Sequence, residues 1–178
     1  MLAASVVYWL PEGNPLFIYD RDQILNGEVW RLITGHLVHL SPEHFGNNLV
    51  LFALTGCWLE YRIGLPCACM PALTSVVAGV YFLFFLPDMA HYGGLSGLAS
   101  VNVVYLCLLE SARNTTARPL WLSMLLLFAA KVGYEILNGK ALFVDGTRFE
   151  VVPSVHIIGA VVALSVFIAS VRARGQRT

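Results

Sequence analysis

The sequence predicts an all-α, polytopic membrane protein that folds as a single domain over residues 1–178. The composition supports this class, because 57% of the residues are hydrophobic and 12% are charged, whereas soluble domains carry about 25% charged residues. The apolar residues also gather in stretches close to the about 20 residues that a membrane-spanning helix needs. The formal net charge is zero, which gives no electrostatic basis for binding nucleic acid.

The first apolar stretch is a stub, "LAASVVYWL" (2–10), which Pro11 interrupts. At about 1.5 Å per residue the stub reaches about 13 Å, which is too short to cross a hydrocarbon core of about 30 Å. We expect a short or truncated first helix, either incomplete or continued upstream of Met1. A cleaved signal peptide fits poorly, because no basic region precedes the stub.

Five later stretches are long and apolar enough, or nearly so, to span a bilayer: residues 43–60, 65–86, 93–110, 119–138 and 152–171. The sequence therefore predicts five full transmembrane helices plus the short N-terminal one. Arginines mark one side of this bundle, in the two short turns and the tail: Arg62, Arg113, Arg118, Arg172, Arg174 and Arg177. Short loops rich in arginine stay in the cytoplasm. The helices that begin near 43, 93 and 152 therefore all start on the outer side.

Four polar residues lie near these three outer starts and are expected at one depth: His44, Asn48, Ser96 and His156. Polar residues inside membrane helices are costly and usually functional. His44 and Asn48 are four residues apart, so they project from the same helix face. Small residues such as Gly97 allow close helix approach, which the Ser96 hydroxyl needs in order to reach the His156 ring.

The chemistry of these side chains is complementary. His156 can act as a general base on Ser96 and later protonate the leaving amine. The Ser96 backbone N–H, at an exposed first helical turn, can donate to an oxyanion, as can the side chains of His44 and Asn48. Because no acidic residue is placed to orient His156, the sequence predicts a dyad.

Each residue also has a simpler interpretation. Ser96 among glycines is typical of helix packing, the helical histidine of a satisfied polar group or a proton relay, and the His44–Asn48 pair of a helix cap. A metal site is not expected, because the spacing of His36, His39 and His44 matches no common zinc signature. The cysteines are interpreted as small core hydrophobes, and no cofactor is expected.

Taken in order, several motifs resemble those of the rhomboid intramembrane serine proteases, from about Gly27 to Val171. They are "EVWRLITGHLVHLSPEH" (28–44), "HFGNN" (44–48), a glutamate at Glu60, "GLSG" (94–97) and "VHIIG" (155–159). The resemblance implies a rhomboid-like helical bundle with Ser96 as the nucleophile and His156 as its base. It implies that His44, Asn48 and the Ser96 backbone form the oxyanion hole.

The resemblance also assigns roles around this centre. Trp30 and Arg31 are expected to anchor the loop of residues 11–42, although Trp30 is also typical of an ordinary interfacial residue. Many family members place a tyrosine one turn after the serine, packed on the histidine, and here that position is Ser100. What holds the His156 ring is therefore open, with Tyr92 and Tyr105 as candidates.

The stretch "YDRDQILNGEVWRLITGHLVHLS" (19–41) and the compact size resemble one branch, the rhombosortases. That branch is associated with proteins that carry a C-terminal Gly-Gly motif, a membrane helix and a basic tail. The resemblance implies a serine endopeptidase of the bacterial inner membrane that cleaves near the outer face. Its expected partners are transmembrane or C-terminally anchored protein substrates and the lipid bilayer. Glycine costs about 1 kcal/mol per helical position relative to alanine, so a Gly-Gly junction unwinds more easily.

Lys131 and Glu135 form an i,i+4 pair deep in the 119–138 stretch. They are interpreted either as a mutually neutralising pair, with the lysine snorkelling, or as a substrate gate that contacts the polar part of a substrate tail. Two other classes of protein stay open. One is a catalytically inactive rhomboid-like protein that binds transmembrane helices. The other is a small transporter or channel subunit with a histidine proton relay.

Overall fold

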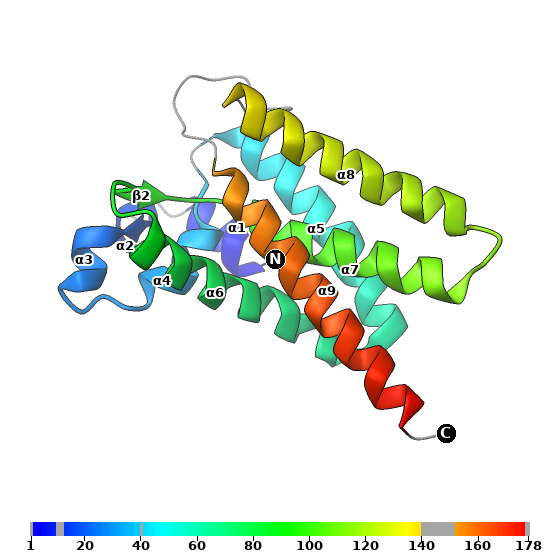
Figure 1. The fold of residues 1–178 in the computed structure, drawn as a ribbon. Helices are drawn as coiled ribbons and strands as arrows, with labels where there is room; N and C mark the ends of the chain where they lie inside the picture. The colour runs from blue at the N-terminus through cyan, green and yellow to red at the C-terminus, as the bar shows by residue number, and fades with distance from the viewer. Residues whose placement is uncertain (1, 10–12, 40, 140–151, 177–178) are drawn as a thin grey trace.

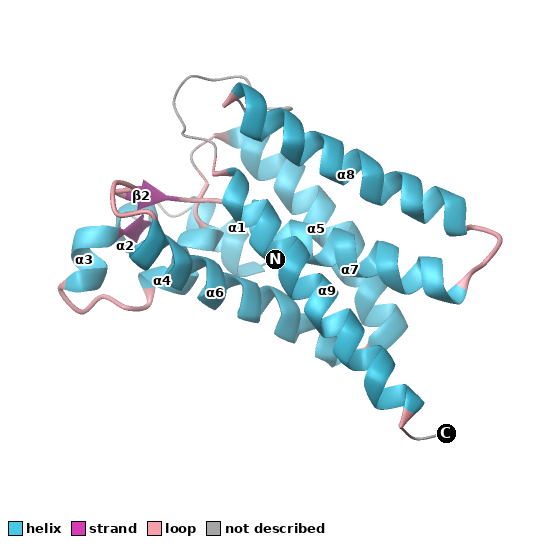
Figure 2. Cartoon of the chain, viewed as in Figure 1, coloured by secondary structure: helices cyan, strands magenta, loops and turns pink. Residues whose placement is uncertain are grey.

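The structure, a computed structural model, describes residues 2–9, 13–39, 41–139 and 152–176. The described chain is almost entirely helical, which confirms the predicted all-helical class (Figures 1 and 2). The predicted break at Pro11, most of the connection before residue 152, and Arg177 lie outside the described residues.

Long helices form the body of the fold: α5 (Pro42–Ile63), α6 (Cys69–Phe85), α7 (Ser96–Arg113), α8 (Arg118–Asn138) and α9 (Pro153–Gly175). The short N-terminal elements are α1 (Leu2–Trp9), α2 (Gly13–Phe17), α3 (Arg21–Leu25) and α4 (Arg31–Thr34). Two 3-10 turns, η1 (Gly35–Leu37) and η2 (Leu65–Ala68), precede α5 and α6. Two strands of two residues each, β1 (Tyr19–Asp20) and β2 (His91–Tyr92), form an unpredicted antiparallel pair in which Tyr19 lies opposite Tyr92.

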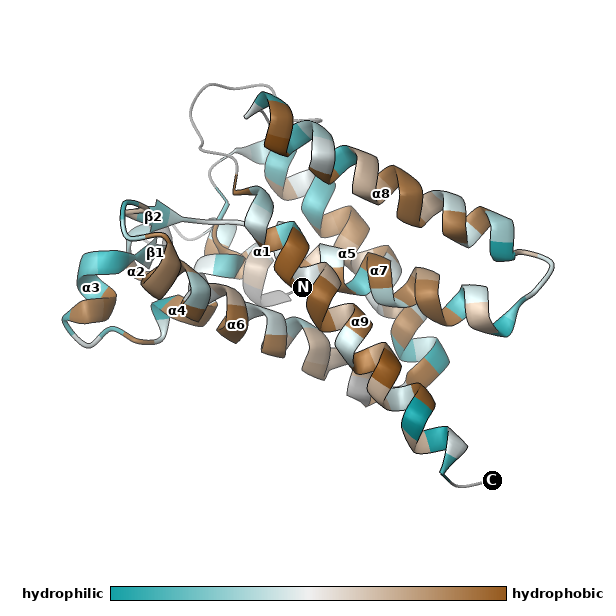
Figure 3. Ribbon diagram, viewed as in Figure 1, coloured by the Kyte–Doolittle hydropathy of each residue, from teal (hydrophilic) through white to brown (hydrophobic). Residues whose placement is uncertain are grey.

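Two of the described helices, α8 and α9, are both long and apolar enough to cross a membrane by length and composition. The apolar helix α6 is shorter, with 17 residues. Large apolar side chains on these helices face outward, such as Leu127 on α8 (70% exposed) and Val161 on α9 (57% exposed). Figure 3 shows hydrophobic bands along α6, α8 and α9. Exposed apolar surface of this extent is typical of contact with lipid.

The helix boundaries follow local chemistry. Ser41 caps α5, since its hydroxyl accepts a hydrogen bond from the His44 N–H at 3.1 Å, and Pro42 occupies the first turn. Gly64, with φ of 71°, ends the same helix. The prediction that the third long helix begins at residue 93 is wrong: α7 begins at Ser96. Gly94 has φ of 149°, a backbone conformation that no helix contains and that glycine adopts most readily.

Helix α7 is the central element of the bundle, since it packs against α5, α6, α8 and α9. Most of its residues are buried, whereas α8 lies at the margin and exposes most of its length (Figure 1). At the end of the bundle where α5 finishes, Arg62 forms a salt bridge with the buried Glu110 of α7, with an Nε–Oε1 distance of 2.6 Å. Glu60, the glutamate singled out by sequence, is exposed at that end.

The opposite end of the bundle carries the short elements and the starts of α5, α7 and α9 (Figure 1). The predicted side-by-side placement of these three starts is visible in contacts. A Cβ at Gly94 would lie 2.9 Å from Cε1 of His44, and a Cβ at Gly97 would lie 2.4 Å from Cγ2 of Val155. The bundle therefore brings the polar residues of three different helices to one end.

Candidate active site

Three hydrogen bonds, with Tyr92, Gly35 and His39 as partners, hold the segment before α7 in place. The Tyr92 hydroxyl donates to the Gly94 carbonyl at 2.9 Å, and the Gly94 N–H donates to the Gly35 carbonyl at 3.3 Å. The Leu95 N–H donates to Nε2 of His39 at 3.2 Å. These bonds fix Ser96 as the first residue of α7, where its backbone N–H has no intrahelical acceptor.

Helices α7 and α9 approach closely because both carry glycine at the crossing point. A Cβ at Gly159 would lie 2.6 Å from the Gly97 carbonyl oxygen and 3.0 Å from Cβ of Ser100. Neither approach leaves room for a side chain larger than hydrogen. The small-residue interface expected from sequence is thus present, and it carries His156 to the flank of α7.

His156 lies in the first part of α9 with only 7% of its surface exposed, and both ring nitrogens have partners. Nδ1 lies 2.8 Å from the Ser100 hydroxyl of α7. Nε2 lies 2.8 Å from Nζ of Lys131 and 3.3 Å from a Glu135 carboxylate oxygen, both on α8. Phe128 also contacts the ring edge-on, with centroids 6.5 Å apart. The imidazole therefore bridges α7 and α8.

These contacts assign the tautomer of His156. The Lys131 ammonium has only donors, and Glu135 lies 2.9 Å from it as its counter-ion, so this contact favours Nε2 as the accepting nitrogen. Ser100 donates its own proton to the Ser96 carbonyl at 2.7 Å, so its oxygen accepts from Nδ1–H. Both arguments give the same result, with the proton on Nδ1 and the lone pair on Nε2. That is the tautomer a general base needs when Nε2 takes the proton.

Ser96 is half-buried and does not hydrogen-bond to His156 in the structure; among the described residues its hydroxyl has Tyr92 as a partner. Burial raises the pKa of Tyr92, and the hydrogen bond from the Ser96 side chain opposes that increase. Ser96 and His156 are nevertheless close in the fold. Ser100, the partner of the histidine, bonds to the backbone of Ser96 itself.

His44 lies on α5 beside the start of α7, and Asn48 lies one turn further along the same face of α5. The His44 ring lies against Gly94, since a Cβ on that glycine would come within 2.9 Å of Cε1 of His44. Asn48 is 9% exposed, and its amide nitrogen is buried without a hydrogen-bond partner among the described residues. A buried donor without an acceptor is costly. Such a donor is suited to bind charge that develops during a reaction.

Lys131 and Glu135 form the expected i,i+4 pair, but sequence reasoning missed where they point. Both side chains turn toward His156 rather than outward, and Glu135 is 2% exposed. Their spacing alone indicated a shared helix face. No sequence signal indicated that this face meets α9.

The predicted loop anchors differ from each other. Arg31 is 5% exposed, pairs with Glu28, and donates through Nη1 to the carbonyls of Pro15 at 2.8 Å and Ile18 at 3.0 Å. Arg31 therefore ties the segment before β1 to α4. Trp30 is 49% exposed and its indole lies 3.4 Å from the Leu16 carbonyl, a weak contact.

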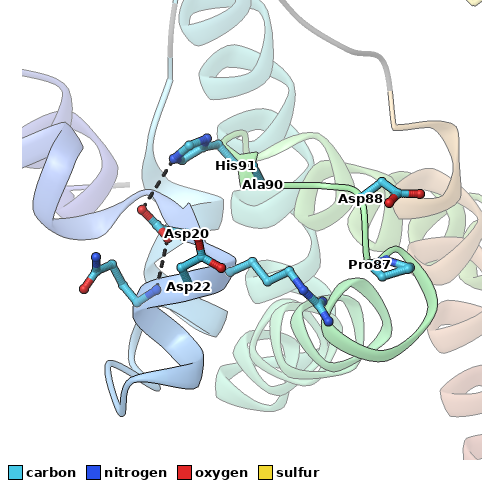
Figure 4. A pocket seen from close by; sticks show the side chains of 8 residues that line it. Asp20, Asp22, Pro87, Asp88, Ala90 and His91 are labelled. Atoms are coloured by element: carbon cyan, nitrogen blue, oxygen red, sulfur yellow. Dashed lines mark hydrogen bonds and ion pairs between the residues drawn. The ribbon is translucent and has the colours of Figure 1, made fainter.

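In the described part of the chain, no three histidine, cysteine or acidic side chains gather as metal ligands. The His39 ring instead accepts from Leu95, as described above. A surface cavity of about 300 Å³ lies between α3 and the connection from α6 to β2 (Figure 4). Asp20, Arg21, Asp88 and His91 line it, and Asp20 pairs with His91 at 3.4 Å. Its lining includes none of His44, Asn48, Ser96 and His156.

A family model of the Rhomboid domain matches residues 26–173 of the chain. The chain belongs to the rhomboid family, whose members are generally intramembrane serine proteases acting on membrane-embedded substrates. The match runs from the segment before Trp30 into the last turn of α9 and includes His44, Asn48, Ser96 and His156. No curated protein matches the chain.

Proposed function

We propose that this rhomboid protein is an intramembrane serine endopeptidase in which Ser96 is the nucleophile and His156 the general base. The observation that carries the proposal is the contact of the His156 Nδ1 with Ser100, 2.8 Å away and one helical turn after Ser96 on α7, which leaves Nε2 to accept a proton. In the reaction Nε2 takes the Ser96 proton while Oγ attacks the scissile carbonyl. The imidazolium then protonates the leaving amine, and water hydrolyses the acyl-enzyme.

The oxyanion of the tetrahedral intermediate is proposed to form beside the start of α7. The Ser96 N–H at the helix start and the Asn48 amide, buried without a partner among the described residues, supply donors from two helices. His44 lies against Gly94 in the same region and supplies a third. Donors fixed in advance need no reorganisation when the negative charge develops.

Lys131 and Glu135 are proposed to gate the reaction. Lys131 occupies the nitrogen that must accept the Ser96 proton, so the dyad forms only after Lys131 leaves Nε2. Glu135 stays paired with the Lys131 ammonium when the lysine leaves Nε2, so this movement needs no new counter-ion. Because α8 lies at the margin of the bundle and faces lipid, a substrate helix that docks along it can reach the pair.

The number of spans, the membrane and the substrate class are inferred from the resemblance of the sequence to the rhombosortases. We propose five full spans, from α5 to α9, with the dyad near the outer face of a bacterial inner membrane. We propose rhombosortase-type substrates, C-terminally anchored proteins with a Gly-Gly junction. Substituting both substrate glycines with alanine is expected to slow cleavage, because the junction then unwinds less readily. Unchanged cleavage would contradict this preference.

One observation favours a second candidate, an inactive protein that binds membrane helices. His156 pairs with Lys131 and Ser100, and its ring makes no hydrogen bond to Ser96 in the structure. A serine-reactive fluorophosphonate probe in native membranes separates the two. Under the protease proposal the wild type and a Ser111→Ala control are labelled, and Ser96→Ala and His156→Ala are not. An unlabelled wild type, or equal labelling of all four, would refute it.

A further inference from the structure

Ser100 occupies the contact between the two helices that carry the dyad. It lies one turn after Ser96 on α7, is 4% exposed, and makes two hydrogen bonds through one oxygen. Its proton goes to the Ser96 carbonyl at 2.7 Å, and its lone pair receives Nδ1–H of His156 at 2.8 Å. A single hydroxyl thus connects the base to the backbone of the nucleophile.

This chain of donors has a direction that matters for catalysis. Because the Ser100 proton is engaged by the Ser96 carbonyl, the hydroxyl is available to His156 only as an acceptor. It therefore stabilises the Nδ1–H form of the ring and leaves Nε2 unprotonated. Ser100 is itself a poor nucleophile here, since it is buried and its proton is not directed at the histidine.

In a catalytic triad a carboxylate accepts the hydrogen bond from Nδ1–H of the histidine. The acidic side chain that the structure places at His156, Glu135, lies at Nε2 and not at Nδ1. The packing also explains why the group at position 100 is small. Cβ of Ser100 lies 3.0 Å from the position that a Cβ on Gly159 would take, so the α9 backbone passes directly over this residue.

We propose that Ser100 is a positioning residue that fixes the orientation and the tautomer of His156, the task of the acidic residue in a triad. This inference rests on the proposed protease function, but the bond itself is measurable without activity. A hydroxyl carries no full charge, so its contribution is smaller than that of a triad carboxylate, whose amide replacement lowers kcat about 10⁴-fold. Partners that orient a metal-bound histidine are typically worth about 10- to 100-fold, and we expect an effect of the same size for a histidine that acts as a base.

The test compares Ser100→Ala with Ser111→Ala in the full chain. Ser111 is on the same helix and its hydroxyl bonds to the Leu108 carbonyl at 3.0 Å, so this control removes a similar bond without touching His156. Nitrogen-15 NMR of histidine-labelled protein, assigned by loss of signals in His156→Gln, reports the protonation of each ring nitrogen. We expect a protonated Nδ1 in the wild type and control, and a changed Nδ1 signal in Ser100→Ala.

Activity gives the second readout. In Ser100→Ala we expect kcat for a transmembrane substrate to fall about 10- to 100-fold with little change in KM, and in Ser111→Ala we expect no such fall. Ser100→Cys keeps the shape with a weaker acceptor and should lie between; it replaces the alanine variant if that one does not fold. Unchanged His156 signals and unchanged kcat in Ser100→Ala would overturn the proposal, as would probe attachment at Ser100.

The two proposals fail in different ways. An inactive wild type with the expected Ser100-dependent His156 signals refutes the protease function and retains the bond that positions the ring. An active wild type whose His156 signals and kcat ignore Ser100 retains the protease and refutes the positioning role.

Discussion

The Lys131 ammonium of α8 lies 2.8 Å from Nε2 of His156 on α9, and Glu135, one turn further along α8, lies 2.9 Å from the same ammonium. In this structure Lys131 therefore contacts Nε2, the ring nitrogen that has to accept the Ser96 proton. Because the pair belongs to the marginal helix, the availability of the base depends on the position of α8.

Replacing the pair by Lys131→Met with Glu135→Gln is expected to increase the rate of Ser96 labelling by a small fluorophosphonate about tenfold. A hydrogen bond to a charged group contributes about 1.5–3 kcal/mol, and its loss releases Nε2. Removing both charges together avoids leaving a buried carboxylate unpaired. The measurement is the second-order labelling rate, with Glu60→Gln, an exposed acid on α5, as the control. Equal or slower labelling of the double variant would contradict the gate.

The glycine crossing of α7 and α9 predicts a sharp difference between two Gly→Ala variants. Gly159→Ala places a Cβ 2.6 Å from the Gly97 carbonyl oxygen, so the helices must separate. We expect a loss of about 1–3 kcal/mol in stability and loss of labelling. Gly133→Ala on α8 meets nothing within 4 Å and should be neutral or stabilising, by up to about 1 kcal/mol. Thermal unfolding in detergent and probe labelling test both variants, and similar behaviour of the two would count against the close crossing.

Replacing Asn48 with alanine is expected to lower the rate of cleavage without unfolding the protein. The buried amide nitrogen of Asn48 has no acceptor among the described residues, so Asn48→Ala removes a group that stabilises little in the resting state. If the amide binds the oxyanion, kcat falls about 10²- to 10³-fold while KM and the unfolding temperature change little. The control is Asn138→Ala, whose amide donates to the Tyr134 carbonyl on the exposed end of α8. A full-rate Asn48→Ala enzyme would exclude this donor.

His39 predicts a pH dependence of stability. Burial, with the charge of His44 as a smaller cause, lowers the pKa of His39 from 6.5 to about 4. As pH falls below about 6.5 the unfolded chain takes up this proton before the folded chain does, so stability decreases between about pH 6.5 and 4 and is flat above. The slope for one such site is at most about 1.4 kcal/mol per pH unit.

The pH prediction is checked by the unfolding temperature of wild type and His39→Gln at pH 7.5, 5.5 and 4.5. His36, buried nearby, has a pKa lowered to about 4 by burial and titrates in the same window in both proteins. We therefore expect a smaller decrease in the variant rather than none. Protonation of His39 in the folded protein, which sets in as the pH approaches about 4, also removes the acceptor for the Leu95 N–H, so labelling of Ser96 should fall there. Identical pH slopes for the two proteins would show that His39 does not titrate this way.

The sequence by itself determined the helical class, the approximate range of each long helix, and the end of the bundle that carries Ser96, His156, His44 and Asn48. These follow from the lengths of apolar stretches and from the alternation of helix directions, which are local properties of the chain. The start of α7 was misplaced, because the run of glycines near Gly94 carries no signal that separates a slender helix from a turn with positive φ.

Only the tertiary structure decided what surrounds the His156 ring. The periodicity of α8 put Lys131 and Glu135 on one face, and the sequence placed Ser100 one turn after Ser96, but neither pattern states which helix lies opposite. That choice depends on how closely α7 and α9 pack at Gly97 and Gly159, and on the angle at which α8 lies beside them. The tautomer of the base is a consequence of this packing, because it is set by which donors and acceptors three separate helices bring to one ring.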